Sequence, residues 1–202
     1  MTTRCHTFTG TGFDPFNPQA EDVRLEDIAH HLAMTCRYGG ACPKFYSVAE
    51  HAVRVSDLVL QVTKSHSWAL YALHHDSAEA YLHDIRRPIK SRLWFSNGLH
   101  DDERGTVCEQ FEYLEDAVMG AIYRALFTHE QLWDETNARE SIGYADDALL
   151  IAEMQSFFGE RPEGIQSPME AALIEKTSNW EAAKSIFLRT HQRLTRRIED
   201  AS

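Results

Sequence analysis

Apolar residues recur along most of this chain at the spacing of an amphipathic α-helix. Runs with this spacing cover residues 25–33, 48–62, 67–82, 101–127, 129–158 and 179–199. No run of alternating apolar and polar residues predicts a β-strand, and no internal repeat or low-complexity linker divides the chain. We therefore expect an all-α fold in which the helices pack as a bundle.

The length of 202 residues suits one well-packed core, so we expect a single domain over residues 1–202. Residues 1–22 should be irregular because glycines and prolines interrupt them, and Asp22 is a possible cap for the first helix. Ser47 begins the sequence Ser-Val-Ala-Glu, which has the pattern of a capping box. In that motif the Ser47 and Glu50 side chains satisfy the first free backbone N–H groups of a helix.

The chain is acidic, with a formal net charge of -11. Nucleic acids and anionic membranes are held by clustered Lys and Arg, so we expect neither as a partner. The helix over 179–199 is basic on one face and apolar on the other, and we expect it to pack within the protein or at an oligomer contact. The polar first residues do not resemble a signal peptide, and no apolar run is long enough to cross a membrane. The expected location is therefore the cytoplasm.

The cysteines do not form a pattern typical of a zinc site. No two of them stand in a Cys-x-x-Cys pair, which is the commonest zinc-binding spacing. In a cytoplasmic protein we expect all of them to be free thiols. They are Cys5, Cys36, Cys42 and Cys108.

A His-Asp pair, His75-Asp76, lies within the helix expected over residues 67–82. An Asp on an apolar helix face is rarely buried unless it is paired or binds a metal. His51 lies on the preceding helix, so a helix hairpin would bring it against His75, and Asp146 is again an acid within an apolar helical run. Two imidazoles and two carboxylates are ligands for Mn, Fe, Co, Ni and Zn. Such a set leaves positions for water and phosphate oxygens, which suits metal-assisted hydrolysis.

The order H…HD…D, formed by His51, His75-Asp76 and Asp146, resembles the HD-domain phosphohydrolase superfamily. Further segments resemble a small branch of it, namely E-D-I-A-H-H-L-A (26–33), C-R-Y-G-G (36–40), F-Y-S-V-A-E-H (45–51), H-H-D-S-A-E-A (74–80), and A-D (145–146) with Glu153. That branch includes bacterial 5'-deoxynucleotidases and phage dATP triphosphohydrolases. The resemblance covers about residues 13–158. It implies a helical HD domain, a divalent transition metal (Co, Mn, Zn, Fe or Ni), and additional Mg or Mn bound with the substrate phosphates.

The fourth ligand has two candidates, because Asp146 and Asp147 are adjacent and point about 100° apart on a helix. Helix geometry alone does not choose between them. The family pattern is Ala-Asp, then an apolar run, then a Glu seven residues after the Asp, and Asp146 with Glu153 matches it. The resemblance therefore favours Asp146.

Two acids after the His-Asp pair are candidate catalytic residues. Glu79 follows Asp76 by three positions, on nearly the same face of the expected helix. The resemblance implies that Glu79 orients or deprotonates the attacking water, although an exposed helix carboxylate is the alternative. Asp84 occupies the position that in the 5'-deoxynucleotidases lies beside the substrate sugar and phosphate. It would accept a hydrogen bond from the 3'-hydroxyl or help to activate water, and the alternative is an ordinary loop acid.

Cationic side chains near these motifs are candidates for binding phosphate. Arg37 presents a planar fork that matches phosphate oxygens, and it resembles the family's Arg-aromatic element. Lys90, in Arg-Pro-Ile-Lys, resembles the family's second basic segment. Arg86 and Arg87 are either further phosphate contacts or part of a solvated surface.

Other histidines lie near the proposed ligands without matching the ligand pattern. His74 neighbours His75 but faces about 100° away on a helix, so we expect it to be packed or to support a ligand. His30 and His31 either bond within the core or contact substrate. We expect His191 at the surface.

The resemblance implies a small nucleotide as substrate. Tyr38 would stack on the base, with Pro88 on its other face. The phage-like segments favour a dNTP triphosphohydrolase acting on dATP, which releases deoxynucleoside and triphosphate. The alternatives are a 5'-deoxynucleotidase acting on dNMPs, a non-catalytic nucleotide-binding HD module, and hydrolysis of cyclic nucleotides or (p)ppGpp. We also expect a homo-oligomer, in the host cytoplasm if the chain is phage-encoded.

Overall fold

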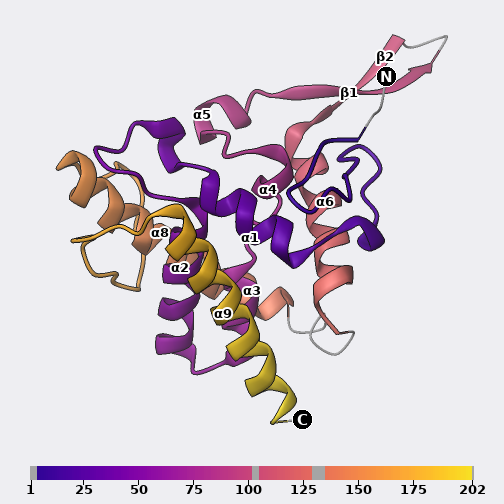
Figure 1. Cartoon of the computed structure of the whole chain (residues 1–202). Helices are drawn as coiled ribbons and strands as arrows, with labels where there is room; N and C mark the ends of the chain where they lie inside the picture. The colour runs from indigo at the N-terminus through magenta and orange to yellow at the C-terminus, as the bar shows by residue number, and fades with distance from the viewer. Residues whose placement is uncertain (1–3, 102–104, 129–134, 202) are drawn as a thin grey trace.

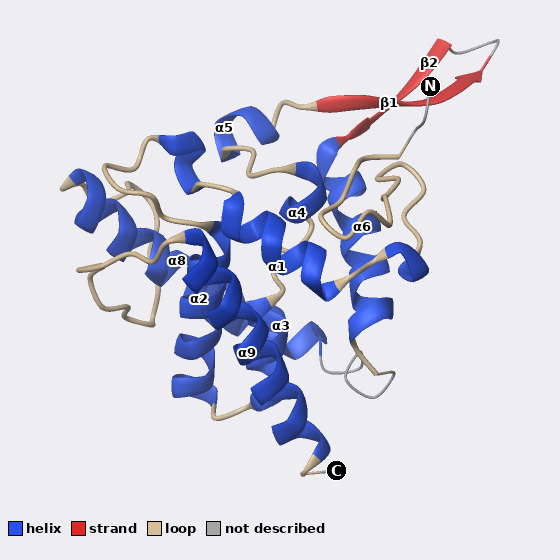
Figure 2. Ribbon diagram, in the orientation of Figure 1, coloured by secondary structure: helices blue, strands red, loops and turns tan. Residues whose placement is uncertain are grey.

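The computed structural model describes residues 4–101, 105–128 and 135–201. Helices form most of its regular structure (Figure 2), so the expected all-α fold is confirmed. The elements in chain order are η1 (Ala20–Asp22), α1 (Leu25–Met34), η2 (Arg37–Gly40), α2 (Val48–Thr63), α3 (His66–Leu73), α4 (Glu79–Leu82), α5 (Arg87–Lys90), β1 (Trp94–Asp101), β2 (Gly105–Gln110), α6 (Phe111–Leu126), α8 (Glu135–Phe158) and α9 (Trp180–Glu199). The helical region expected over 129–158 is α8 from residue 135 onward, and residues 129–134 lie outside the described chain.

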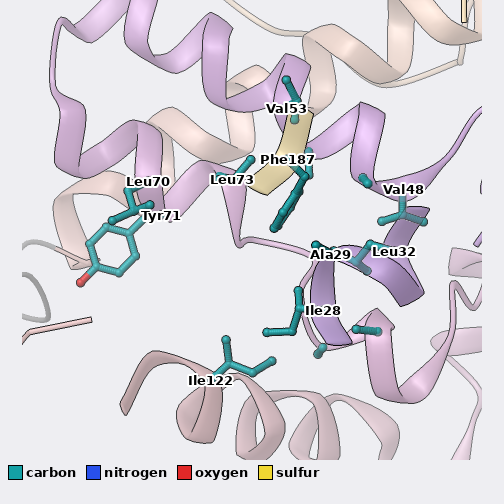
Figure 3. Close-up of a cluster of buried hydrophobic side chains, with 14 of the residues drawn as sticks. Ile28, Ala29, Leu32, Val48, Val53, Leu70, Tyr71, Leu73, Ile122 and Phe187 are labelled. Carbon is teal, nitrogen blue, oxygen red and sulfur yellow. The ribbon is translucent and has the colours of Figure 1, made fainter. Parts of the chain in front are cut away.

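The main core lies between α1, α2, α3, α6 and α9 (Figure 1). α2 and α3 form a helix hairpin, α9 packs on it beside α1, and α8 lies against α2 and α3. Figure 3 shows buried core residues from these elements, among them Ile28, Leu32, Val48, Val53, Leu70, Leu73, Ile122 and Phe187. Burying one such Val, Leu, Ile or Phe side chain contributes about 1.5–3 kcal/mol to the stability of the fold. The packed helix hairpin therefore holds the residues that it carries in fixed positions.

The C-terminal helix packs into this core. Asn179 caps α9 by accepting a hydrogen bond from the backbone N–H of Ala182 at 2.9 Å. Phe187 and Leu194 are fully buried, so the expected packing of the helix over 179–199 is confirmed. In the part of the chain that the structure describes, no helix has the length and apolar character needed to cross a membrane.

The start of α2 shows one half of the expected capping box. The Ser47 hydroxyl accepts a hydrogen bond from the backbone N–H of Glu50 at 3.1 Å, as predicted. The Glu50 carboxylate does not complete the motif. It accepts instead from Arg54 at 2.8 Å and from the backbone N–H of Ser178 at 2.7 Å. The prediction for Glu50 is therefore wrong, and its carboxylate ties α2 to the segment before α9.

The N-terminal segment is largely irregular, as expected, apart from η1 and an isolated bridge between Cys5 and Phe13. The expected cap at Asp22 is wrong, because its carboxylate pairs with Arg4 at 2.7 Å. Arg24, the residue before α1, makes no side-chain cap. Three cysteines are free thiols, as expected, namely Cys5, Cys36 and Cys42, whereas the side chain of Cys108 lies outside the described residues.

The helix expected over residues 67–82 is interrupted. α3 ends at Leu73, residues 74–78 form turns, and the single-turn helix α4 follows. The prediction that His75 and Asp76 lie inside a helix is therefore wrong. They lie in the turns between α3 and α4, where they approach α2 and α8.

The interruption coincides with a network around His74, which is fully buried. One ring nitrogen lies 2.9 Å from the Ser77 hydroxyl and the other lies 2.9 Å from Nδ1 of His191 on α9. Burying an imidazole without such partners would cost free energy, so these bonds favour the turn over a continued helix. The expected packing of His74 is confirmed. The expected exposure of His191 is wrong, since only 9% of it is exposed.

The segment before α6 differs most from the expectation. Residues 94–101 and 105–110 form the antiparallel pair β1–β2, which extends away from the helices (Figures 1 and 2). The expected absence of strands is wrong here, and the helix expected from residue 101 begins at Phe111. Gly105 lies inside the helix expected over 101–127 and is a poor helix former, which disfavours a helix at the start of that segment.

Candidate metal centre

Three elements bring the four predicted ligands together. His51 comes from α2, His75 and Asp76 from the turns after α3, and Asp146 from α8. One ligand atom from each of His51, His75 and Asp76 lies within 4.8 Å of the others, so this group could hold a metal ion. Asp146 Oδ1 lies 3.1 Å from Nε2 of His51 and 4.0 Å from Nε2 of His75. The helix hairpin predicted to bring His51 against His75 is confirmed, with ring centroids 5.3 Å apart.

Both imidazoles have one satisfied and one unsatisfied nitrogen. Nδ1 of His51 donates to Glu153 at 2.7 Å, and Nδ1 of His75 donates to the Ala72 carbonyl at 2.7 Å. The two Nε2 atoms are buried and make no hydrogen bond. A ring held through Nδ1 leaves Nε2 to a divalent transition metal, which would take the place of any proton on that nitrogen.

The carboxylates and imidazoles of the site alter each other's pKa values. Burial alone would lower the pKa of His75, but Asp76 and Asp146 outweigh it and raise that pKa to about 9. Burial would raise the pKa of Asp76, but His75, His51 and Arg37 hold it well below its usual range. The site therefore gathers negative charge on carboxylates that face the two Nε2 atoms, as a cation site requires.

A cavity of about 340 Å³ opens beside the metal-binding group. Asp76 and Asp146 line it, so the candidate ligands are accessible from this side. The same cavity collects the other residues that the sequence singled out, namely Arg37, Tyr38, Glu79, Asp84, Arg86, Arg87, Pro88 and Lys90. A ligand in the cavity would meet four cationic side chains on its way to the carboxylates.

The two adjacent aspartates of α8 point differently. Asp146 faces the imidazoles and also pairs through Oδ2 with Arg87 at 3.1 Å. Asp147 lies 3.9 Å from Arg87, and its side chain is 32% exposed. Asp146 thus lies within 4.0 Å of both imidazoles, and its assignment as the fourth ligand stays a prediction.

The cationic side chains of the cavity differ in the ion pairs that they make within the protein. Lys90 pairs with Glu115 at 2.7 Å, and Arg37 lies between Glu153 and Asp76. Arg87 is 66% exposed and reaches across the cavity from α5 to Asp146 on α8. Of the two arginines left open by the sequence, Arg87 thus contacts a candidate ligand directly.

Glu79 and Asp84 face the same cavity as Asp76, although Glu79 begins a separate helix and does not share one with Asp76. Burial, with repulsion from Asp76 and Asp84, raises the pKa of Glu79 well above its usual value. One Glu79 oxygen is buried without a hydrogen-bond partner. Burial also raises the pKa of Asp84. Both carboxyl groups therefore hold a proton more readily than an exposed carboxyl group does.

Two curated bacterial proteins are similar to this chain, and no protein-family model matches it. The uncharacterized protein RCAP_rcc00048 of Rhodobacter capsulatus is 30% identical over 157 residues, which are 75% of this chain and 77% of that protein. The chain belongs to the same family. The uncharacterized protein YfdR of Escherichia coli K12 is 42% identical over 87 residues, 43% of this chain. That match spans about half of YfdR, at 46% of its length.

The structure adds side chains to which the sequence gave no role. Glu153 is fully buried and bonds both His51 and Tyr46. Its position seven residues after Asp146, two helical turns along α8, was the available signal for a shared face. Tyr46 carried no such signal. His31 is held by Ala80 and Phe8, which agrees with the core alternative for that residue.

Proposed function

We propose that this protein is a metal-dependent nucleotide phosphohydrolase with an HD-type site. The ligands would be His51, His75, Asp76 and Asp146. The observation that carries the proposal is the pair of buried Nε2 atoms, which make no hydrogen bonds and face carboxylates at the end of a cavity that four basic and four acidic side chains line. The motif-level resemblance to HD phosphohydrolases points to the same chemistry.

The ligand set of two imidazoles and two carboxylates suits Co, Mn, Zn, Fe or Ni, with Mg or Mn accompanying the substrate phosphates. When bound, such a metal supplies Lewis acidity, which makes a water more acidic and neutralises charge on phosphoryl oxygens.

The residues of the cavity divide into two tasks. Arg37, Arg87 and Lys90 would neutralise and orient the phosphate chain, because guanidinium and ammonium groups make strong hydrogen bonds to phosphate oxygens. Glu79 would hold or accept a proton of the attacking water, for which a raised pKa is favourable. Asp84 would accept a hydrogen bond from the sugar.

The base would lie against Tyr38 and Pro88. Tyr38 has a left-handed backbone with φ of 57°, which is unusual for a residue other than glycine and is found at ligand clamps. Its hydroxyl donates to Glu153 at 2.7 Å, so the ring is fixed before a nucleotide arrives.

We favour a deoxynucleoside triphosphate as the substrate, with dATP first, on the strength of the resemblance to the phage branch. A 5'-deoxynucleotidase acting on dNMPs is the second candidate. The cavity supports this second candidate, because about 340 Å³ lies near the small end of the range of ligand pockets.

Product analysis separates the candidates. Purified protein is incubated with each dNTP and each dNMP in the presence of Co²⁺ or Mn²⁺, and the products are resolved by chromatography. We expect dATP to yield deoxyadenosine and triphosphate. Release of phosphate from monophosphates alone would contradict the triphosphohydrolase activity and support the 5'-deoxynucleotidase. Nucleotide binding without any release would indicate a non-catalytic module.

A further inference from the structure

We propose that Glu153 is a positioning residue, which holds His51 in the tautomer that binds a metal through Nε2 and fixes Arg37 through the same carboxylate. The inference rests on the metal centre of the proposed function. It deepens that proposal by adding a residue that acts on the metal through a ligand and not by direct contact.

Five donor groups from four residues surround the Glu153 carboxylate. Oε1 accepts from Nδ1 of His51 at 2.7 Å and from the Tyr46 hydroxyl at 2.9 Å. Oε2 accepts from the Tyr38 hydroxyl at 2.7 Å, and from Nε and Nη2 of Arg37 at 3.3 and 3.2 Å. The side chain of Glu153 is 0% exposed, so water does not compete for these donors. The carboxylate is therefore held at both oxygens.

The two oxygens face different parts of the site. Oε1 supports the ligand His51, whereas Oε2 supports Arg37 and Tyr38, which both line the cavity. Arg37 also approaches a second ligand, with Nη1 3.7 Å from Asp76 Oδ2. One buried carboxylate thus connects the metal side of the site with its ligand-binding side.

The charge of Glu153 determines which nitrogen of His51 is free. A carboxylate only accepts hydrogen bonds, so Nδ1 of His51 has to donate, and the lone pair stays on Nε2. In His75 the backbone carbonyl of Ala72 has the same effect, because it accepts the hydrogen bond from Nδ1. Because a side chain does this for His51, the effect can be removed by a substitution that leaves the backbone unchanged.

Glu153→Gln tests this dependence at almost constant shape. The amide oxygen would turn toward Arg37 and Tyr38, because the guanidinium of Arg37 has no acceptor for an amide N–H. The amide NH₂ would then face His51 and donate to Nδ1. This moves the imidazole proton to Nε2, where it blocks a metal.

Glu50→Gln is a matched control. Glu50 is also a buried Glu that accepts a bond from an arginine, Arg54, and it lies next to His51 in α2. Its other partner is the backbone N–H of Ser178, on the way to α9. The substitution removes a buried carboxylate without changing the partner of His51.

Co²⁺ affinity is measured by competition with a chromophoric chelator for the wild type and both variants, after circular dichroism confirms folding. Loss of a hydrogen-bond partner behind a metal ligand typically costs about 10–100-fold in affinity, and we expect this loss for Glu153→Gln. Glu50→Gln should melt at a lower temperature but bind Co²⁺ like the wild type. Equal affinity of Glu153→Gln and the wild type would overturn the inference.

NMR of Zn²⁺-loaded wild-type protein gives a second test that does not require a folded variant. We expect the His51 proton on Nδ1, in a hydrogen bond, and Zn²⁺ on Nε2. Ligation through Nδ1 would overturn the inference. A wild type that binds neither metal would overturn the metal centre as well, whereas metal binding without hydrolysis would overturn only the proposed activity.

Discussion

His74 and His75 are adjacent in sequence and occupy opposite environments. His74 is fully buried, and both of its ring nitrogens have partners, Ser77 and His191. Burial holds its pKa well below the usual value. His75 has one nitrogen bonded to a carbonyl and the other facing Asp76 at 3.1 Å without a hydrogen bond. Its pKa is raised to about 9.

The difference shows what distinguishes a candidate ligand from a structural histidine. Burial does not distinguish the two histidines, since both side chains lie inside the protein. A histidine whose nitrogens are both used by protein groups has no lone pair to offer. A histidine that donates through Nδ1 and faces carboxylates with Nε2 can bind a cation through Nε2.

The largest effect is expected from removing ligands. His75→Ala combined with Asp76→Ala should lower metal affinity by more than the roughly 100-fold that loss of an outer partner can cost, and should abolish hydrolysis. His191→Gln, which alters only the partner of His74, should retain the metal. Metal content after dialysis, measured by mass spectrometry, checks both variants. Unchanged metal content and activity in the double variant would contradict the proposal of a metal-dependent phosphohydrolase.

The second prediction separates the neighbouring aspartates. Asp146→Asn should weaken metal binding by about 100-fold, because an amide oxygen replaces a charged ligand that faces both imidazoles. Asp147→Asn should leave the affinity unchanged, since that carboxylate lies toward Arg87. Titration with Co²⁺ measures both variants. A larger loss for Asp147→Asn would reverse the assignment of the fourth ligand.

The sequence was sufficient to predict the all-α fold and the grouping of His51, His75, Asp76 and Asp146. Helical spacing is a local property, and it predicted α1, α2 and α9 well. The grouping was predicted by motif order and by the expected helix hairpin. The four side chains still lie together although the helix was predicted to continue to residue 82. His75 and Asp76 approach His51 from the turns after α3 and not from within a helix.

The turn itself was not predictable from local pattern. It coincides with the contact between His74 and His191, a residue 117 positions away on α9. The role of Glu153 likewise depends on Arg37, Tyr38 and Tyr46, which only the folded chain brings to it. Hydrogen bonds between distant segments leave no periodic signal in the sequence, so the sequence alone does not predict the roles of such side chains.

The third prediction concerns Arg87, which reaches a ligand from the cavity side. Arg87→Ala should lower kcat/KM by about tenfold, at the weak end of a charged hydrogen bond because the side chain is 66% exposed. Arg92→Ala is the control, since Arg92 is an exposed cation nearby that donates to the Pro88 carbonyl at 3.4 Å. Steady-state kinetics at fixed metal concentration measures both. Equal loss in the two variants would assign Arg87 to the general surface charge.

The smallest effect is expected for the structural histidine pair, measured on metal-free protein. Burial lowers the pKa of His191 to about 4 from the ordinary value of 6.5. The unfolded chain therefore takes up this proton first as pH falls, and stability present above pH 6.5 is lost toward pH 4. His75 has a raised pKa, so its contribution is complete below pH 6.5 and is lost only as pH rises through about 9.

Between pH 6.5 and 5, the pair His74–His191 should thus contribute to the decline in stability, whereas His75 should not. His191 alone should account for about 1–2 kcal/mol over this interval. His191→Gln keeps a hydrogen-bonding group beside His74 but does not titrate, so its urea unfolding free energy should fall less by that amount. The measurement is urea unfolding at both pH values with a chelator present. If wild type and variant decline equally, the pair is not what makes the protein sensitive to acid, and the contrast between His74 and His75 loses its energetic basis.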